Sequence, residues 1–307
     1  MLKKIINNVE QVIVGKREAI ELVVTALISN GHILLEDVPG VGKTRLIAAV
    51  ARSIDGSFKR IQFTADVLPS DITGFSVYNQ KTGDFEFKKG AIMSQFVLAD
   101  EINRTSPKTQ AALLEAMEER QISVDGVTYK MPQPFMVMAT QNPIEFMGTF
   151  PLPEAQLDRF LIKISVGYPD AESERSVLSM HQMDDPFDTL EAVATTDDII
   201  NIQNEVKKVF VHENLESYIV SLVSATRNHP SVRLGASPRA SLALYRTAQA
   251  TAYIDGRDYV VPDDIQKMMI PVMAHRIILS QETKFSNTTA EDVLEEIKKS
   301  TPVPTGK

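Results

Sequence analysis

The chain has 307 residues, of which 43% are hydrophobic and 23% charged, so it is long enough for two compact domains with ordinary globular cores. It contains no cysteine, which excludes disulfides, thiolate metal sites and cysteine nucleophiles. The formal net charge of −8 argues against broad, non-specific attraction to nucleic acid, which depends on a basic surface. No apolar run approaches the ~20 residues that span a bilayer, and the N-terminus lacks the continuous hydrophobic stretch of a signal peptide. We therefore expect a soluble, cytoplasmic protein.

The first half of the chain alternates short apolar runs with segments of helical periodicity. Continuous apolar runs of strand length occur at residues 32–35, 96–99 and 135–139. Such runs are typical of strands buried on both faces of a parallel sheet. A helical stretch over residues 107–119 lies between two of them. Strand–helix alternation of this kind predicts a three-layer α/β domain with a parallel sheet, which we assign to residues 1–168.

Two segments of this first half have hairpin character. Residues 121–129 alternate apolar and polar side chains around Asp125-Gly126, which is a strong hairpin turn signal. Residues 75–87 form a similar but weaker case, with Thr82-Gly83-Asp84 at the middle. We expect both segments to form hairpins beside the parallel sheet.

After about Pro169 the strand signals fade and the chain becomes a succession of helices. These are expected at residues 171–181, 195–209, 215–228, 238–254, 262–279 and from about 289 onward. Thr288 with Glu291 resembles a capping box for the last of them. The second half therefore predicts a smaller all-α domain over residues 169–307.

A glycine-rich loop follows the first apolar run and precedes a helical segment. Residues 36–44 read Glu-Asp-Val-Pro-Gly-Val-Gly-Lys-Thr, and strand, glycine loop and helix are the context that a Walker A phosphate loop requires. Glycines let backbone N–H groups turn toward phosphates, and the helix N-terminus adds a favourable dipole. The candidate nucleotide-binding residues here are Pro39, Gly40, Val41, Gly42, Lys43, Thr44 and Arg45.

Two residues of this loop have side chains with specific expected roles. Lys43 would reach the β- and γ-phosphates of a nucleotide, and the Thr44 hydroxyl would bind Mg²⁺. One position departs from the generic pattern, which has glycine where this chain has Asp37. A glycine-rich turn with an incidental lysine is the alternative, and the order and context of the whole loop disfavour it.

Two acidic residues end the second apolar run. Residues 96–101 read Phe-Val-Leu-Ala-Asp-Glu, and a buried strand would deliver both carboxylates at its C-terminal end, where ligands collect in open α/β sheets. Asp100 suits the Mg²⁺ shell, and Glu101 suits polarising an attacking water. Acids also follow strands because loops are solvated, but the upstream phosphate loop favours the functional interpretation.

Four further segments point to a family. They are Asp-Glu-Ile-Asn-Arg at 100–104, Leu-Leu-Glu-Ala-Met-Glu-Glu at 113–119, Ala-Thr-Gln-Asn-Pro at 139–143 and Leu-Pro-Glu-Ala-Gln-Leu-Asp-Arg-Phe at 152–160. Together they resemble the MoxR family of AAA+ ATPases, from about residue 11 to residue 276. The resemblance implies ATP and Mg²⁺ as ligands and hydrolysis of ATP to ADP and phosphate. It also implies a homo-oligomer, as a hexameric ring, that acts with a von Willebrand factor A domain protein on a client protein complex.

The resemblance also assigns roles to single residues. Asn142 matches the sensor 1 residue that positions water near the γ-phosphate, with a plain turn before Pro143 as the alternative. Arg159 matches the arginine finger given across a subunit interface, a cation worth roughly 10³–10⁵-fold in rate in related systems. Arg239 matches sensor 2 at the start of a lid helix, where the helix dipole disfavours a cation unless an anion lies nearby. Val14 and Gly15 belong to a segment that matches the adenine side of the site.

Other interpretations of the two arginines stay open. Arg159 could pair with Asp158 or another surface acid, and Arg239 could simply be solvated. The segment that contains Val14 and Gly15 could equally serve core packing. Arg104 and Arg233 could also approach a subunit interface, with no role assigned.

The leading functional hypothesis is an ATP-driven, chaperone-like remodeller of partner complexes. The two hairpins resemble the helix-2 insert and pre-sensor-1 hairpin of this AAA+ branch, which would point toward the pore of a ring. A nucleic-acid motor is the second hypothesis, but Asp125-Gly126 carries no cation and Lys81 is balanced by Asp84 at the other tip. A nucleotide-gated scaffold with slow hydrolysis is the third. None of the five histidines has a metal-ligand spacing.

Overall fold

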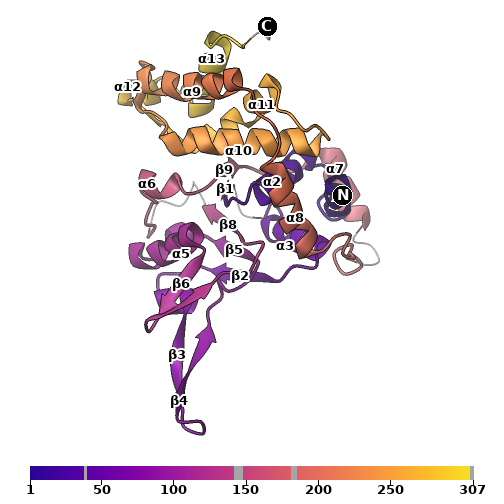
Figure 1. Cartoon of the computed structure of the whole chain (residues 1–307), viewed down its shortest axis with the longest axis vertical. Helices are drawn as coiled ribbons and strands as arrows, with labels where there is room; N and C mark the ends of the chain where they lie inside the picture. Colours follow the sequence, from indigo (N-terminus) through magenta and orange to yellow (C-terminus); the bar gives the residue numbers. More distant parts are fainter. Residues whose placement is uncertain (38–39, 142–147, 181–184, 305–307) are drawn as a thin grey trace. The chain divides into compact units, whose positions relative to one another are not determined.

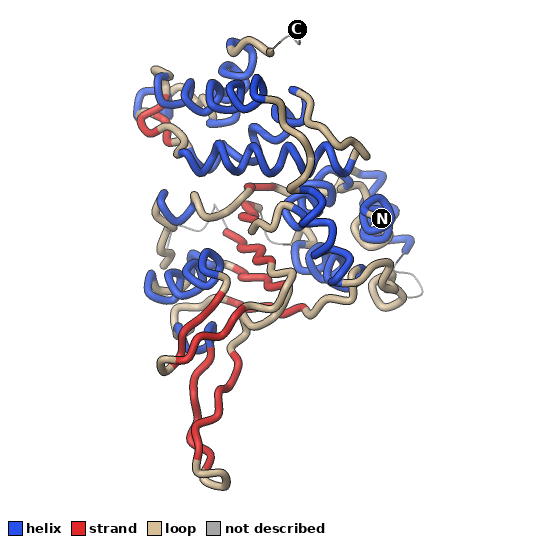
Figure 2. Tube along the Cα trace, viewed as in Figure 1, coloured by secondary structure: helices blue, strands red, loops and turns tan. Residues whose placement is uncertain are grey.

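The computed structural model describes residues 1–37, 40–141, 148–180 and 185–304, and it divides into two compact units (Figures 1 and 2). The first unit comprises Met1–Pro153 and Ile164–Ile200, and the second comprises Glu154–Lys163 and Asn201–Lys307. This division does not coincide with the predicted boundary at 168/169, because the chain after residue 169 still packs on the first unit for some thirty residues. For example, Val193 N donates to Ser53 O at 2.9 Å. The assignment of 1–168 and 169–307 as domains remains a prediction.

A five-stranded sheet in the order β2-β5-β8-β1-β9 carries the first unit, and its edge strand β9 crosses the division because its first two residues fall in the second unit. Its strands are β1 (Ile33–Glu36), β2 (Phe58–Gln62), β5 (Phe96–Asp100), β8 (Met136–Gln141) and β9 (Ile162–Ile164). The pairs β2–β5, β5–β8 and β1–β8 are all parallel. The three predicted strands are the buried ones, β1, β5 and β8. Strand β2 gave no apolar run because only Ile61 in it is buried.

Helices flank this sheet and confirm the predicted α/β class. The helical elements of the first unit are α1 (Leu2–Glu10), α2 (Arg17–Ile28), α3 (Lys43–Ser53), α4 (Pro69–Thr73), the 3₁₀ turn Ile102–Arg104, α5 (Pro107–Glu119) and α7 (Ala171–Met180). In Figure 1, α3 lies to the right of the sheet and α5 to its left. Helix α5 begins where its sequence predicts, with Pro107 in the first turn and Ser106 Oγ accepting from Thr109 N at 3.3 Å.

Both predicted hairpins are present and lie side by side. Strands β3 (Gly74–Asn79) and β4 (Asp84–Lys89) pair antiparallel, as do β6 (Gln121–Val124) and β7 (Val127–Lys130). Asp125 and Gly126 have φ values of 51° and 79°, the left-handed pair that a tight two-residue turn requires. Phe87 and Tyr129 stack with ring centroids 4.0 Å apart, which joins the two hairpins. Figure 2 shows both projecting from the same end of the unit.

The second unit is almost entirely helical. Its helices are α6 (Glu154–Leu157), α9 (Glu213–Asn228), α10 (Pro238–Ile254), α11 (Pro262–Met273), α12 (Gln281–Phe285) and α13 (Ala290–Ser300), and α8 (Thr196–Val206) runs into it from the first unit. Strands β10 (Val232–Leu234) and β11 (Ile278–Leu279) form a small antiparallel pair within it. No helix among the described residues is long and apolar enough to cross a bilayer.

Two details of the helix predictions are wrong. The helix expected over 262–279 ends at Met273 and continues as a 3₁₀ turn, which directs Arg276 inward to donate to Asp158 Oδ1 at 2.8 Å. The capping box before α13 uses Thr289 with Asp292, one residue beyond the predicted pair Thr288 and Glu291. Thr289 Oγ1 accepts from Asp292 N at 3.1 Å, and Asp292 Oδ2 accepts from Thr289 N at 2.9 Å.

A buried histidine ties the sheet to α5. Val137 N donates to His32 Nδ1 at 3.0 Å, and His32 Nε2 donates to the Met117 carbonyl at 3.1 Å. Burial, with a smaller contribution from the charge of Arg120, lowers the pKa of His32 to about 3, although the bond to Met117 opposes the change. The imidazole is therefore neutral in the folded protein.

This burial predicts a pH-dependent stability. The unfolded chain protonates His32 near pH 6.5, whereas the folded protein resists protonation down to about pH 3, so stability falls as the pH drops through that window. Between pH 7.5 and pH 5.0 the contribution amounts to about 2 kcal/mol in the free energy of unfolding. Urea unfolding at the two pH values measures it.

Matched variants separate this effect from that of the carboxylates. His32→Asn keeps an acceptor near Val137 N and should lose the extra pH dependence. His212→Asn replaces an exposed histidine at the N-cap of α9 with another good capping residue. This variant should keep the pH dependence of the wild type. Equal pH dependence in the wild type and His32→Asn would contradict the assignment.

Candidate nucleotide-binding site

The phosphate loop joins β1 to α3. Gly40 and Gly42 have φ values of 88° and 85°, in the left-handed region that side chains strongly disfavour. A Cβ built on either glycine meets no atom within 4 Å, so the backbone conformation rather than crowding requires glycine here. Gly42 is the N-cap of α3, and Lys43 is the first residue of that helix. The N-terminal N–H groups of α3 therefore open toward the loop.

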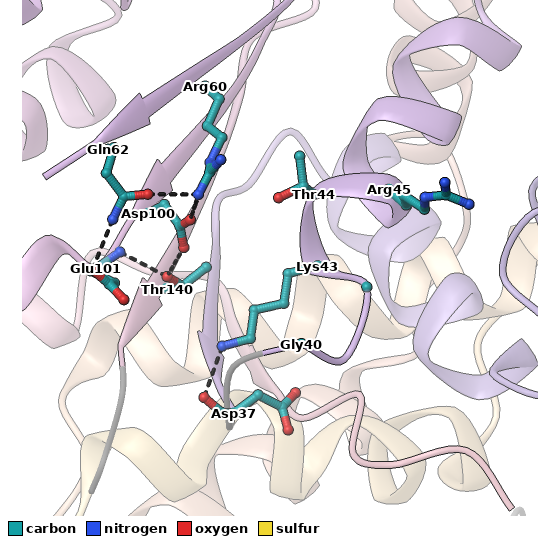
Figure 3. Close-up of a pocket in the computed structure, with 11 residues that line it drawn as sticks. Asp37, Gly40, Lys43, Thr44, Arg45, Arg60, Gln62, Asp100, Glu101 and Thr140 are labelled. Atoms are coloured by element: carbon teal, nitrogen blue, oxygen red, sulfur yellow. Dashed lines mark hydrogen bonds and ion pairs between the residues drawn. The ribbon is translucent and has the colours of Figure 1, made fainter. Parts of the chain in front are cut away.

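A pocket of about 440 Å³ lies at the carboxyl ends of the central strands (Figure 3). Its lining consists of Asp37, Gly40, Gly42, Lys43, Thr44, Arg45, Arg60, Gln62, Asp100, Glu101 and Thr140. Because β8 lies between β1 and β5 and all three run parallel, the segments that follow these strands meet at one edge of the sheet. The structure thus brings five of the predicted loop residues together with both predicted acids, namely Gly40, Gly42, Lys43, Thr44 and Arg45.

Lys43 is half-buried beside this acidic edge. Its Nζ donates to the Asp37 carbonyl at 2.8 Å. Desolvation lowers the pKa of Lys43, while the charges of Asp37, Asp100 and Glu101 act in the opposite direction. A partly desolvated ammonium of this kind favours an anionic ligand such as a phosphate.

The two acids are held by the strands on either side. Thr140 Oγ1 donates to Asp100 Oδ1 at 2.7 Å and accepts from Glu101 N at 2.8 Å. Asp100 Oδ2 accepts from Arg60 Nη2 at 2.6 Å and from Arg60 Nε at 3.1 Å. Glu101 Oε2 accepts from Gln62 Nε2 at 2.8 Å (Figure 3).

Glu101 adopts a backbone conformation that non-glycine residues seldom show. Its φ of 58° lies in the left-handed region and turns the chain sharply after β5. Its carboxylate also pairs with Arg104, whose Nη1 lies 3.0 Å from Glu101 Oε2. Arg104 had no assigned role in the sequence, and the structure places it against the second acid of the pocket.

Four residues of the pocket lining were not predicted as site residues. Arg60 and Gln62 lie on β2, the strand that carries no apolar run, so no local pattern points to them. Thr140 stands two residues before Asn142 in the segment that resembles the MoxR family, which is the one signal available. Asp37 appeared only as a departure from the generic loop.

The structure gives a reason for aspartate at that departure. The Asp37 side chain is buried and accepts from Ser165 Oγ at 2.9 Å and from Gly167 N at 3.1 Å, and also from Val166 N. It therefore fastens the segment that follows β9 to the start of the phosphate loop. A glycine at this position could not make these bonds.

Some of the other predicted site residues lie away from the pocket lining, and others fall outside the described residues. Pro39 and Asn142 fall outside the described residues. Val41 lies in the loop, while Val14 and Gly15 lie between α1 and α2 in the same unit, outside the pocket lining as the described residues form it. Their expected contact with adenine stays a prediction.

Arg45 lines the pocket but its guanidinium is directed away from Lys43 (Figure 3). It forms an ion pair with Asp185, with Nη1 donating to Oδ1 at 3.2 Å. The segment after α7 is thereby attached to the helix that carries the phosphate loop.

The two predicted transition-state arginines belong to the second unit. Asp158, the ion-pair partner considered for Arg159, accepts from Arg276 Nε and from Ser237 Oγ, both at 2.8 Å. Arg239 stands in the first turn of α10, where Ser237 Oγ accepts from Arg239 N at 3.1 Å as the N-cap. The helix start is as predicted, and the approach of Arg159 and Arg239 to phosphates remains a prediction.

The donor set suits magnesium better than a transition metal. The Thr44 hydroxyl and the Asp100 carboxylate line one pocket and offer hard oxygen ligands. Among the described residues no group of three or more His, Asp or Glu side chains could hold a metal ion by itself. That fits Mg²⁺, which is usually bound through one or two protein oxygens together with substrate phosphates.

The parallel sheet, the glycine loop at a helix N-terminus and the two acids at the same edge of the sheet define a P-loop nucleotide-binding protein. A model of the ATPase family associated with various cellular activities (AAA) matches residues 32–162, and a model of the AAA lid domain matches residues 224–297. The chain is 53% identical to the uncharacterized protein YeaC of Bacillus subtilis over 99% of this chain and 95% of that protein.

Two named relatives and one solved structure extend the comparison. The chain is 42% identical to Chaperone MoxR1 of Mycobacterium tuberculosis, over 99% of this chain and 82% of that protein. It is 34% identical to Protein MoxR of Methylorubrum extorquens, over 89% of this chain and 86% of that protein. A crystal structure of a Cytophaga hutchinsonii protein superimposes with a TM-score of 0.92 at 41% identity, over 99% of this chain and 94% of that one. The chain therefore belongs to the MoxR family of AAA+ ATPases.

The bonds of Asp37 generate a prediction. Asp37→Gly, which restores the generic loop, should lower the free energy of unfolding by about 2–4 kcal/mol, because it leaves buried N–H donors without their charged acceptor. Asp37→Asn keeps one acceptor oxygen and should lose about half as much. Urea unfolding measures both. A glycine variant as stable as the wild type would show that the bonds to residues 165–167 are dispensable.

Proposed function

We propose that the chain binds Mg-ATP in this pocket and hydrolyses it to ADP and phosphate. The observation that carries the proposal is the convergence of Lys43, Thr44, Asp100 and Glu101 on one pocket at the N-terminus of α3. In it the loop amides and Lys43 hold the phosphates, and Thr44 and Asp100 hold the metal. Bound Mg²⁺ would supply neutralisation of charge on the transferring phosphoryl group.

The remaining roles follow from the chemistry that the site needs. Glu101 accepts a proton from the attacking water, and Asn142 positions that water. Arg159 and Arg239 supply planar cations to the γ-phosphoryl, Arg159 from a neighbouring subunit. Val14 and Gly15 lie at the adenine side. A site that uses a neighbour's arginine is complete only in an oligomer, for which we propose a hexameric ring.

We further propose that ATP turnover serves chaperone-like remodelling of a partner protein complex, together with a von Willebrand factor A domain protein. The relative named Chaperone MoxR1 supports this role. The hairpins β3–β4 and β6–β7 support it as well, because Phe75, Tyr78, Phe85 and Val127 expose large apolar side chains on them. Such exposed apolar surface is typical of contacts with other proteins.

The role of Glu101 can be tested directly. Glu101→Gln should lower the steady-state rate of ATP hydrolysis by about 10²–10⁴-fold, as expected on loss of a general base. The variant should still bind ATP, whereas Lys43→Ala should lose binding because the phosphates lose their ammonium. Phosphate release and calorimetric titration with Mg-ATP give the two readouts.

A surface control belongs with this experiment. Glu205→Gln makes the same change on α8, where the exposed side chain of Glu205 pairs with Lys208 at 2.7 Å. Its ATPase rate should match that of the wild type. Undiminished turnover in Glu101→Gln would contradict the assigned role, and absence of Mg-ATP binding by the wild type would overturn the proposed function.

The role of Arg159 across a subunit interface can be tested without a client. Arg159→Ala subunits retain the phosphate loop, and Lys43→Ala subunits retain the arginine. Mixed oligomers should recover part of the ATPase activity, because some sites then combine an intact loop with an intact neighbouring arginine. Mixing is checked by native mass spectrometry, and no recovery in confirmed mixtures would place Arg159 outside the neighbouring site.

A further inference from the structure

Arg60 lies in the pocket and pairs with the residue that we assign to the metal. Both of its hydrogen bonds to Asp100 end on the same oxygen, Oδ2, at 2.6 Å and 3.1 Å. The other oxygen, Oδ1, accepts from Thr140 Oγ1. Each oxygen of the Asp100 carboxylate therefore already has a donor.

The geometry of β2 makes this pairing possible. Gln62 stands opposite Asp100 in the parallel register of β2 and β5, and Arg60 precedes Gln62 by two residues. Side chains two apart on a strand project from the same face, so Arg60 and Gln62 both face the pocket. Figure 3 shows the two side chains beside Asp100 and Glu101.

A cation at Asp100 has to compete with Arg60. Arg60 carries a permanent positive charge on two donors aimed at Oδ2, the oxygen that Thr140 leaves available. Two cations that share one carboxylate oxygen repel each other, so a metal can use Oδ2 only when the guanidinium withdraws. Arg60 is about half exposed, at 48%, against 16% for Asp100, so its side chain has room to move toward solvent.

We propose that Arg60 is a positioning residue: it holds the Asp100 carboxylate before nucleotide binds, and it withdraws when Mg²⁺ arrives with the nucleotide. This inference rests on the proposed Mg-ATP site. Arg60 Nη2 also donates to Gln62 Oε1 at 2.6 Å, and Gln62 Nε2 donates to Glu101 Oε2 at 2.8 Å. Withdrawal of Arg60 therefore removes a bond that orients the Gln62 amide toward Glu101. The arrival of the metal thereby loosens one of two contacts that hold the Glu101 carboxylate, the other being the ion pair with Arg104.

The test measures the dependence of nucleotide binding on Mg²⁺. A fluorescent, non-hydrolysable ATP analogue is bound to the full-length protein while the Mg²⁺ concentration is raised. Arg60→Met removes the competing charge and keeps most of the side-chain volume. The half-saturating Mg²⁺ concentration should fall about two- to fivefold, the size expected of a half-exposed ion pair. A residue with a purely structural role would change this value in the opposite direction.

Arg17→Met is the matched control. Arg17 is 50% exposed in its side chain and pairs with Glu10 at 2.6 Å outside the pocket lining, so its removal takes the same charge from an ion pair that does not face the metal. Its half-saturating Mg²⁺ concentration should stay near that of the wild type. Arg60→Lys keeps the positive charge but lacks the paired donors of the guanidinium, so it should lower the half-saturating Mg²⁺ concentration by less than Arg60→Met does. This second variant provides the test if Arg60→Met folds poorly.

The outcomes are distinct. An unchanged or raised half-saturating Mg²⁺ concentration in both Arg60 variants overturns the inference. Weaker binding of the analogue by Arg60→Met at saturating Mg²⁺ also overturns it, because Arg60 would then be a ligand of the nucleotide. A wild type that binds no analogue at any Mg²⁺ concentration would overturn the proposed function instead, and this inference with it.

The link between Arg60 and Gln62 has its own test. Gln62→Leu removes the acceptor that steadies Arg60 and should shift the half-saturating Mg²⁺ concentration in the same direction as Arg60→Met, by less. The double variant with Arg60→Met should show the same shift as Arg60→Met alone, because the effects of substitutions within one hydrogen-bonded network are not additive. Fully additive shifts would show that Gln62 acts independently of Arg60.

Discussion

The candidate site depends on the position of β8 between the strand that carries the phosphate loop and the strand that carries the acids. Parallel strands end at the same edge of a sheet, so the chain segments after β1, β8 and β5 open onto one space. Thr140, at the end of the middle strand, then reaches the side chain of Asp100 and the backbone of Glu101. The same arrangement faces Lys43, at the start of α3, toward both acids.

The positive and negative side chains of this site lie close together and neutralise one another. Lys43 and Arg60 face Asp100 and Glu101, and each charged group has at least one hydrogen-bonding partner on the protein. A triphosphate with its metal brings both signs of charge, so it can replace these internal pairs rather than add to them. The charged side chains of the pocket are already oriented toward the ligand, and their interactions with it offset the free-energy cost of desolvating the ligand. Arg60 illustrates the point, since it holds Asp100 where a metal is expected.

Local sequence signals were sufficient where the chemistry is local. Continuous apolar runs gave β1, β5 and β8, because a strand covered on both faces needs apolar side chains at every position. The loop up to Thr44 and the pair Asp100-Glu101 are visible in the sequence because each function requires particular residue types at consecutive positions. The Asp125-Gly126 turn was recognised because few residues accept its backbone angles. The cap of α13 was missed by one residue, since adjacent threonines followed by adjacent acids satisfy the same pattern.

Taken alone, the sequence determined the class of fold, the phosphate loop and the order of helices and hairpins, since each rests on neighbours along the chain. Only the tertiary structure decided which distant residues complete the pocket. Arg60 and Gln62 enter it because β2 pairs with β5, a pairing that no local pattern on an exposed strand reveals. The reason for an aspartate at position 37 also lies in the tertiary structure, where Ser165 Oγ and Gly167 N donate to its carboxylate. Contacts between segments far apart in sequence depend on how the strands are ordered, and strand order is a property of the folded sheet.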